Sequence, residues 1–400
     1  MKIAWICHFS NSEIQDIIKP YRRVHAYAPW ITNTARLFEN QQQHELNVIS
    51  PHRFIAGSKS FVLRGVRYHF FNPGIPGWGR QWPPFFRFDL ITSYRHNSKM
   101  IHKFIDSINP DVIHLQGAEN PYYSSSIFKL RDRFPIVVNL QRMDPEFRFG
   151  NTAEARKRKT VEMAIVKGFK NFSIRTDTMR NDLLKVNPTA KTYWVPYNIP
   201  QPVPFKGPKE YDLVYFARVS KQKGIEDLIQ AAALLTPDFP NLTLCVIGGV
   251  NQNYREYLDG LALAGGVKII WKGLLPEIED VHREACKARI SVLPTHQDII
   301  PGTIVESMQL GLPVVSYKVG SIPELNAETE SVLLVEKGDI VGLADNIRRL
   351  LSDTEYADQL AKTAKRTIDK FISAHNVLNK HLSCYEDVIG EYQTQIKSNV

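Results

Sequence analysis

The stretch HQDIIPGTIVESMQLGLPVVSYKVGSIPEL, residues 296–325, contains a turn, a short helix pattern and a strand pattern in succession. Pro301 and Gly302 predict the start of a helix over TIVESMQLG, and Gly311 predicts its end. The apolar run PVVSYK (313–318) that follows predicts a buried strand. A helix that leads into a buried strand is the repeating element of parallel sheets.

Short β-rich runs separated by amphipathic stretches continue along the chain on the N-terminal and C-terminal sides of this segment. They are residues 2–8, 45–50, 111–116, 136–141 and 171–175 in the first half, and 212–218, 242–249, 267–273, 289–294, 313–318 and 331–336 in the second. This alternation predicts an α/β fold with parallel sheets that are covered by helices on both faces.

A proline-rich segment divides the two series of strands. IPQPVPFKGPKEYD (199–212) contains four prolines and suits an extended hinge better than a helix or a central strand. We therefore expect two doubly wound, Rossmann-like domains that face an interdomain cleft, over residues 1–200 and 211–370, with a hinge over 201–210. A helical stripe of apolar residues predicts that 371–400 form a C-terminal helix that packs back toward the N-terminal domain.

The positive charge of the chain is concentrated in its first half. The net charge is +9, yet residues 1–200 hold 29 Lys and Arg against 15 Asp and Glu, while residues 201–400 hold 21 against 26. An anionic ligand or membrane surface would be attracted to the first half, although a solvated basic face without a partner remains an alternative. No nucleic-acid-binding motif accompanies the charge, so nucleic acid is not an expected partner.

Several other features exclude common classes of protein. No apolar run approaches the roughly 18 residues that cross a bilayer, and MKIAWICHFS is too short for a signal peptide, which predicts a cytoplasmic protein. The four cysteines have no paired spacing and are expected to be buried thiols. Asp144 and Glu146 form an acidic pair between arginines, where ion pairing is favoured over a metal site, so no metal is expected.

The segment 296–325 also carries two acids, Asp298 and Glu306. The first N–H groups of the predicted helix would be free to bind an anion. Glu306 would lie about one turn further along, where a carboxylate can accept two hydrogen bonds from a ribose diol, and Asp298 could do the same for sugar hydroxyls. Taken alone, two acids eight positions apart favour a structural role.

Two further sets of residues could contribute to a binding site. In FARVSKQKGIEDLI a strand ends near Arg218 and a helix begins near Gly224, which leaves Arg218, Lys221 and Lys223 in one loop that could surround a diphosphate. In CVIGGV, Gly248 and Gly249 end a strand and would allow a backbone or a ligand to approach closely. Solvent-exposed cations and an ordinary turn are the alternatives for these two segments.

Together these segments resemble the retaining glycosyltransferases of family four, which have the two-domain GT-B fold. ARVSKQKG is similar to the family pattern G-R-L-x-x-x-K-G, and IGGV follows as I-G-x-G does in the family. DIIPGTIVESMQLGLPVVSYKVGSIPEL matches the family's last motif at Pro301, Glu306, Met308, Gly311, Pro313, Gly320 and Glu324. Further similarity lies in HELNVISP, NPDVIHLQ and VPYNI, so that the resemblance covers nearly the whole chain.

The resemblance implies a retaining, metal-independent hexosyltransferase that takes a UDP-sugar or GDP-sugar as substrate and needs no cofactor. It implies an acceptor-binding N-terminal domain and a donor-binding C-terminal domain. The site residues that it implies are Arg218 and Lys223 on the diphosphate, Glu306 on the ribose, Gly248 near the donor, and Asp298 with Ile299, Ile300, Pro301, Gly302 and Thr303 on the sugar.

Three positions depart from the family pattern. Asp298 stands where the family usually has Glu, Gln141 stands where it often has a His that touches the donor sugar, and APWITNTAR (28–36) replaces a glycine pair. Glutamine cannot act as a general base. A non-catalytic GT-B protein that binds a nucleotide sugar or a partner transferase, and a sugar-nucleotide epimerase, are therefore the alternative functions.

The first half carries a segment that could contact the acceptor. Residues 68–90, YHFFNPGIPGWGRQWPPFFRFDL, are rich in aromatic side chains, prolines and glycines and are expected to form a loop, and EARKRKT (154–160) is basic. Aromatic and basic residues together suit an anionic membrane and a glycan or polyprenyl-diphosphate-linked acceptor of cell-surface polysaccharide or glycolipid synthesis. Such a protein would lie on the inner face of the membrane. Aromatics that fold into the domain's own core are the alternative.

Overall fold

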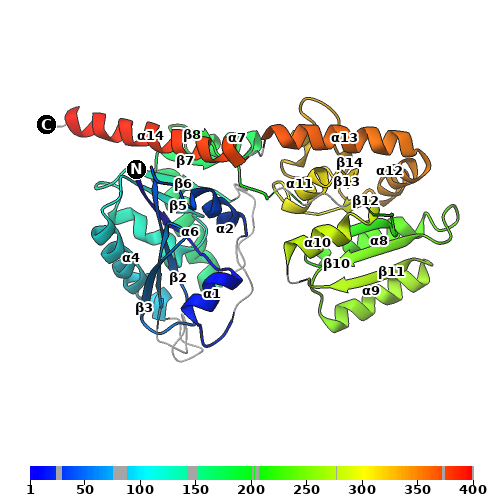
Figure 1. The fold of residues 1–400 in the computed structure, drawn as a ribbon, viewed down its shortest axis with the longest axis horizontal. Helices are drawn as coiled ribbons and strands as arrows, with labels where there is room; N and C mark the ends of the chain where they lie inside the picture. The colour runs from blue at the N-terminus through cyan, green and yellow to red at the C-terminus, as the bar shows by residue number, and fades with distance from the viewer. Residues whose placement is uncertain are drawn as a thin grey trace. The chain divides into compact units, whose positions relative to one another are not determined.

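The computed structural model describes residues 1–23, 29–74, 88–141, 152–200, 202, 207–275, 277–371 and 374–398. The chain divides into two compact units. Unit 1 comprises Met1–Asn198 and Ala374–Val400, and unit 2 comprises Ile199–Ser373 (Figure 1). Each unit is built on a sheet of mainly parallel strands, which confirms the predicted α/β class with two Rossmann-like sheets.

The sheet of unit 1 has the strand order β3-β4-β2-β1-β5-β6-β7-β8. All neighbours in it are parallel except β3 and β4, which are antiparallel. Its strands are β1 (Lys2–Ile6), β2 (Glu45–Pro51), β3 (Ser58–Leu63), β4 (Val66–Phe71), β5 (Val112–Gln116), β6 (Ile136–Asn139), β7 (Asn171–Ile174) and β8 (Lys191–Trp194). Its helices are α1 (Ser12–Ile18), α2 (Pro29–Ala35), α3 (Phe88–Ile91), α4 (Arg95–Ile108), α5 (Pro121–Ser124), α6 (Ala153–Gly168), α7 (Asp177–Val186) and α14 (Ala374–Ser398), with 3-10 turns η1 (Arg36–Phe38) and η2 (Ser125–Lys129).

The sheet of unit 2 is parallel throughout, in the order β11-β10-β9-β12-β13-β14. Its strands are β9 (Tyr211–Phe216), β10 (Thr243–Ile247), β11 (Lys268–Gly273), β12 (Ala288–Leu293), β13 (Val314–Tyr317) and β14 (Leu333–Val335). Its helices are α8 (Ile225–Ala233), α9 (Gln252–Ala264), α10 (Ile278–Ala285), α11 (Gly302–Gln309), α12 (Ile340–Ser352) and α13 (Thr354–Phe371), with 3-10 turns η3 (Lys221–Lys223) and η4 (Ile322–Asn326).

Both faces of the unit 2 sheet are buried. Leu213 and Tyr215 of β9 point into the larger core, which includes apolar residues of α8, α9 and α12. Val214 and Phe216 point into a smaller core on the other face, which α10 covers. This alternation along one strand explains why β9 is an almost continuous apolar run in the sequence.

The aromatic segment expected to be a loop begins as a strand, so the prediction for residues 68–71 was wrong. Tyr68 and Phe70 lie in β4, are buried, and stack with Phe61 of β3. Arg64 and Gly65 have positive φ angles and join β3 to β4 through a two-residue hairpin turn. Aromatic side chains on one face of a hairpin stabilise it by such contacts. The rest of the segment, residues 75–87, lies outside the described residues.

Helix α14 belongs to unit 1 although it ends the chain, and Figure 1 shows it in red beside β7 and β8. Tyr385 of α14 is buried in the core of unit 1, where its hydroxyl accepts a hydrogen bond from Trp5 Nε1 at 3.0 Å. Lys191 of β8 forms ion pairs with Asp387 and Glu391. In the described part of the chain, no helix combines the length and hydropathy needed to cross a membrane.

Candidate functional site

The first part of the candidate site is the loop between β9 and α8. The chain leaves β9, makes the 3-10 turn η3, and enters α8 through Gly224, which has φ 76°. Arg218 is exposed at the start of this loop, and its carbonyl oxygen accepts a hydrogen bond from the Tyr215 hydroxyl at 2.9 Å. Burial raises the pKa of Tyr215, so this hydroxyl stays protonated and continues to donate. Lys223 is partly buried at the other end of the loop.

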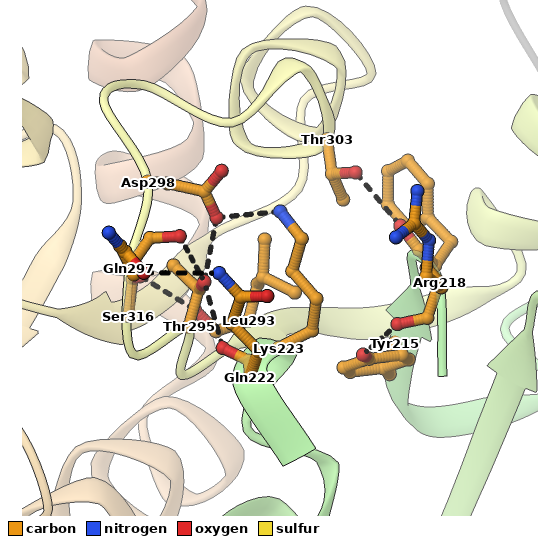
Figure 2. Close-up of polar contacts among 11 residues, drawn as sticks. Tyr215, Arg218, Gln222, Lys223, Leu293, Thr295, Gln297, Asp298, Thr303 and Ser316 are labelled. Carbon is orange, nitrogen blue, oxygen red and sulfur yellow. Dashed lines mark hydrogen bonds and ion pairs between the residues drawn. The ribbon is translucent and has the colours of Figure 1, made fainter. Parts of the chain in front are cut away.

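The loop that follows β12 lies next to the β9–α8 loop. Asp298 belongs to this second loop, and its Oδ2 atom accepts two bonds of 2.6 Å, from Lys223 Nζ and from the hydroxyl of Thr295 (Figure 2). The backbone of the two loops is joined as well, because His296 N–H donates to the Gln222 carbonyl oxygen at 2.9 Å. The carboxylate of Asp298 is thus held by one cation and one hydroxyl.

The start of α11 forms the third part of the site. Pro301 occupies the N-cap position, and no side chain caps the helix. The Ile304 N–H donates to the Pro301 carbonyl oxygen at 3.1 Å, so the N–H groups without an acceptor within the helix are those of Gly302 and Thr303. Thr303 ties this end to β9, because its hydroxyl donates to the Phe216 carbonyl oxygen at 2.9 Å. In Figure 2 the side chains of Arg218 and Lys223 extend on the side of the loop where Thr303 lies. Gly302 is exposed beside it, and Ile299 and Ile300 are half-buried in the preceding turn.

Glu306 lies one turn into α11, and its carboxylate is directed back toward the start of the helix. Its Oε1 atom is 3.5 Å from the point that a Cβ on Gly302 would occupy. Its Oε2 atom is 3.5 Å from Nε2 of His282 in α10, at ion-pair distance if the imidazole is protonated. The Glu306 side chain is 21% exposed, so a ligand at the helix start can reach it.

Three glycines allow close backbone contacts that shape these loops. A Cβ on Gly224 would lie 1.8 Å from the Pro294 carbonyl oxygen, and one on Gly248 would lie 2.0 Å from the Ala217 carbonyl oxygen. Gly320, with φ 54°, passes equally close to Asp298, since its Cβ would lie 1.8 Å from the Asp298 carbonyl oxygen. Gly248 is therefore packed against the protein's own backbone at the end of β9.

The structure brings together Arg218, Lys223, Asp298, Thr303 and Glu306 around the carboxyl ends of β9 and β12, which are neighbours in the sheet. Ligands of doubly wound sheets bind at this edge.

Sequence reasoning missed three residues that contact the site: Thr295, His282 and Gly320 as a neighbour of Asp298. The family pattern includes a glycine at position 320, which was a signal for a backbone constraint. Thr295 directly follows the predicted strand that ends at Pro294, whereas nothing in the sequence around His282 marks it as a neighbour of Glu306.

Gln141, at the position of the family's histidine, lies in unit 1, where its carbonyl oxygen accepts a hydrogen bond from Arg175. Asp144 and Glu146 lie outside the described residues. Within the described ranges, no group of three or more His, Cys, Asp or Glu side chains is placed to hold a metal ion.

Comparison with known families finds a match in the second half of the chain. Residues 201–367, which contain the complete site, match the family Glycosyl transferases group 1. The second half of the chain is thus similar to this family, over less than half of the chain's length. Among curated relatives, the capsular polysaccharide biosynthesis glycosyltransferase CapM of Staphylococcus aureus is 24% identical over 178 residues, or 44% of this chain. That match spans only 46% of CapM, so the chain aligns with under half the length of this relative.

Solved structures show similarity of fold over both units. Sucrose-phosphate synthase from Thermosynechococcus elongatus superposes with a TM-score of 0.75 at 17% identity, over 98% of this chain and all of that one. Anabaena Alr3699/HepE in complex with UDP and glucose superposes with a TM-score of 0.67 at 16% identity, over 97% of this chain and all of that one. These likenesses confirm the predicted GT-B fold.

Proposed function

We propose that this protein is a retaining glycosyltransferase that moves a sugar from a nucleoside-diphosphate sugar to an acceptor. The observation that carries the proposal is the contact between Lys223 and Asp298 beside the uncapped start of α11. This contact supports the proposal, because a cation, the N–H groups at the start of α11 and a carboxylate would be available to one ligand. A sugar nucleotide needs these three partners for its diphosphate and its hydroxyl groups.

Arg218, Lys223 and the first N–H groups of α11 are suited to the diphosphate. Arg218 is exposed and can offer two parallel N–H groups to phosphate oxygens. Lys223 has three N–H donors, so it can keep Asp298 and still bind a phosphate oxygen. Cleavage of the bond between sugar and diphosphate leaves negative charge on the phosphate, which these fixed donors stabilise without rearrangement.

The two acids are suited to the hydroxyl groups of the donor. Glu306 can accept hydrogen bonds from the two hydroxyls of a ribose, and Asp298 with the backbone of Ile299 to Thr303 can accept and donate bonds to the sugar. In our proposal the departing phosphate accepts the proton of the acceptor hydroxyl, so no side chain has to act as general base. This assignment is compatible with glutamine at position 141.

The acceptor that we propose is a glycan or a polyprenyl-diphosphate-linked sugar of cell-surface polysaccharide or glycolipid synthesis, and we assign its binding to unit 1. CapM is named for capsular polysaccharide biosynthesis. Helix α4 carries exposed Arg95, Lys99 and Lys103 at spacings of four residues, and α6 begins with a basic run in which Lys157 Nζ donates to the hydroxyl of Ser93, just before α4. These cations support contact with an anionic membrane on its cytoplasmic side.

Sedimentation with anionic vesicles tests the membrane contact. Vesicles of phosphatidylglycerol and phosphatidylcholine should bind the protein at low salt and release it as the ionic strength rises, because screening shortens the reach of surface charge. Replacement of Arg95, Lys99 and Lys103 by Ala should weaken binding several-fold. Absence of binding at low salt would remove the membrane from the proposal and leave a water-soluble glycan as acceptor.

Thermal unfolding with nucleotides tests the donor site. UDP, GDP and their common sugar conjugates at about 1 mM should stabilise the protein by about 2.7 kcal/mol if the dissociation constant is near 10 μM. Arg218→Ala should abolish the shift. Lys221→Ala is the matched control, because Lys221 lies in the same loop, is 81% exposed and is paired at 3.7 Å with Glu226.

The outcomes separate the proposed functions. A shift with one nucleotide that Arg218→Ala removes and Lys221→Ala retains supports the donor site. Release of the nucleoside diphosphate from that donor when acceptor glycans are added supports transfer. Binding without any release favours the non-catalytic alternative, and conversion of the donor into another sugar nucleotide favours the epimerase. No shift with any nucleotide contradicts the proposal.

A further inference from the structure

His282 of α10 is a buried histidine with a ring nitrogen that has no hydrogen-bond partner. Val281 and Ala285 on either side of it pack into the smaller core of unit 2. The His282 side chain is 7% exposed, and its Nε2 atom is buried without a hydrogen-bond partner. A buried nitrogen that lacks a partner costs free energy, so its retention calls for an explanation.

The polar group in front of His282 is the carboxylate of Glu306. Nε2 lies 3.5 Å from Glu306 Oε2, about 0.5 Å longer than a good hydrogen bond. Hydrogen bonds of a site are often long in the free protein and shorten when a ligand binds. The other oxygen, Oε1, leans over Gly302 at the start of α11. The orientation of this carboxylate is thus set by α10 on one side and by the first turn of its own helix on the other.

We infer that His282 is a positioning residue that aims the Glu306 carboxylate at the ribose of the donor and so contributes to the choice of ribonucleotides over 2′-deoxyribonucleotides. The inference rests on the proposed function, in which Glu306 binds the ribose. A hydrogen bond from His282 to Oε2 leaves the remaining lone pairs of both oxygens for the two ribose hydroxyls. Without His282 the carboxylate would be free to rotate toward solvent, and the paired geometry would be lost.

A role in packing alone predicts a different result. If His282 only filled space between α10 and α11, its removal would weaken every nucleotide equally. If it acts through Glu306, its removal weakens a ribonucleotide but hardly affects a ligand that lacks the 2′-hydroxyl. The comparison of UDP with 2′-deoxy-UDP, and of GDP with 2′-deoxy-GDP, therefore separates positioning from packing.

Calorimetric titration of the protein with these four ligands provides the test. In wild type the ribonucleotide that binds should be preferred on the order of tenfold over its 2′-deoxy form, which corresponds to about 1.4 kcal/mol. His282→Ala should weaken the ribonucleotide about five- to tenfold and the 2′-deoxy form less than twofold. His282→Gln, which keeps an N–H donor and most of the side-chain volume, should restore much of the preference.

Two further variants complete the cycle. Arg283→Ala is the control, because Arg283 follows His282 in α10, is 59% exposed and contacts Asp280 at 2.7 Å, so both affinities should stay unchanged. The single substitution Glu306→Gln should abolish the preference for the ribonucleotide over its 2′-deoxy form. Addition of His282→Ala to Glu306→Gln should then have less than a twofold effect, because the two side chains act as one unit.

Equal weakening of ribonucleotide and 2′-deoxynucleotide by His282→Ala overturns the inference and leaves the donor site standing. Unchanged affinity of His282→Ala for both ligands overturns it in the same way. Failure of wild type to bind either UDP or GDP overturns the proposed function, and this inference with it.

Discussion

Nζ of Lys223 lies 2.6 Å from Oδ2 of Asp298, although 75 positions separate the two residues in the chain. The same oxygen accepts a hydrogen bond of 2.6 Å from the Thr295 hydroxyl. The lysine proposed for the diphosphate is therefore already paired with the acid proposed for the sugar. A diphosphate that binds Lys223 would therefore share this cation with the Asp298 carboxylate.

Asp298→Asn should separate binding of the nucleotide from transfer of the sugar. The change removes a negative charge next to Lys223, so the affinity for a nucleoside diphosphate should stay equal or rise a few-fold. Transfer should fall on the order of 100-fold, because one fixed partner of the reacting sugar is lost. Titration calorimetry and a diphosphate-release assay measure the two effects. Asp280→Asn, on the surface of α10, is the control, and a large loss of nucleotide affinity in Asp298→Asn would contradict the prediction.

Gly320→Ala should displace the loop that carries Asp298. The new Cβ would lie 1.8 Å from the Asp298 carbonyl oxygen, and φ 54° is unfavourable for alanine. The free energy of unfolding should fall by about 2–3 kcal/mol, and donor binding should weaken together with it. Thermal denaturation with and without nucleotide measures both.

Gly260→Ala is the matched control for this substitution. Gly260 lies in α9 with no atom within 4 Å of the added methyl group, and alanine is the better helix former by roughly 0.5–1 kcal/mol. The control should therefore be neutral or stabilising. A Gly320→Ala protein that is as stable and as active as wild type would show that the loop can move away without cost.

Tyr385→Phe should destabilise unit 1 without affecting the donor site. Its hydroxyl accepts a hydrogen bond of 3.0 Å from Trp5 Nε1 and lies 2.7 Å from Nδ1 of His114. The side chains of Trp5 and His114 are both buried. Loss of the hydroxyl leaves two buried polar atoms with one partner fewer, which costs about 2–4 kcal/mol. Urea denaturation measures the loss. Tyr392→Phe in α14 removes only an exposed hydrogen bond of 3.2 Å to the Asp132 carbonyl oxygen and should change stability by less than about 0.5 kcal/mol. A matching loss of nucleotide affinity in Tyr385→Phe would contradict the assignment.

Unit 1 should lose stability in mild acid because of its buried histidines. Burial lowers the pKa of His381 from 6.5 to about 4 and holds the pKa of His114 well below its usual value. The unfolded chain binds these protons first as the pH falls, so the contribution is complete above about pH 6.5 and is lost as the pH falls toward 4. For His381 alone the loss at pH 5 is about 2 kcal/mol.

Urea denaturation at pH 7.5 and pH 5 measures this dependence. His381→Gln removes the titrating group while it keeps an N–H donor for the Val377 carbonyl oxygen, which accepts from Nδ1 at 2.9 Å. The variant should be less stable than wild type at pH 7.5 but should lose less stability between the two pH values. An equal loss in both proteins would mean that His381 does not carry the dependence.

The local pattern of the sequence determined the elements and much of the order in which they occur. β-rich runs such as 212–218 and 242–249 became β9 and β10, and Pro301 with Gly302 marked the start of α11, because strand and helix periodicity and turn chemistry act over a few residues. The hairpin of β3 and β4 was missed. Its aromatic residues were attributed to the loop that follows them, and only the cross-strand stacking shows that they belong to the core.

The tertiary structure alone decided which side chains meet. Lys223 contacts Asp298 because β9 and β12 are neighbours in the strand order, and no local pattern specifies that order. The contact of His282 with Glu306 likewise depends on where α10 packs beside α11. Sequence periodicity specifies which face of an element is buried, whereas the partner that buries it is selected by the packing of the whole unit.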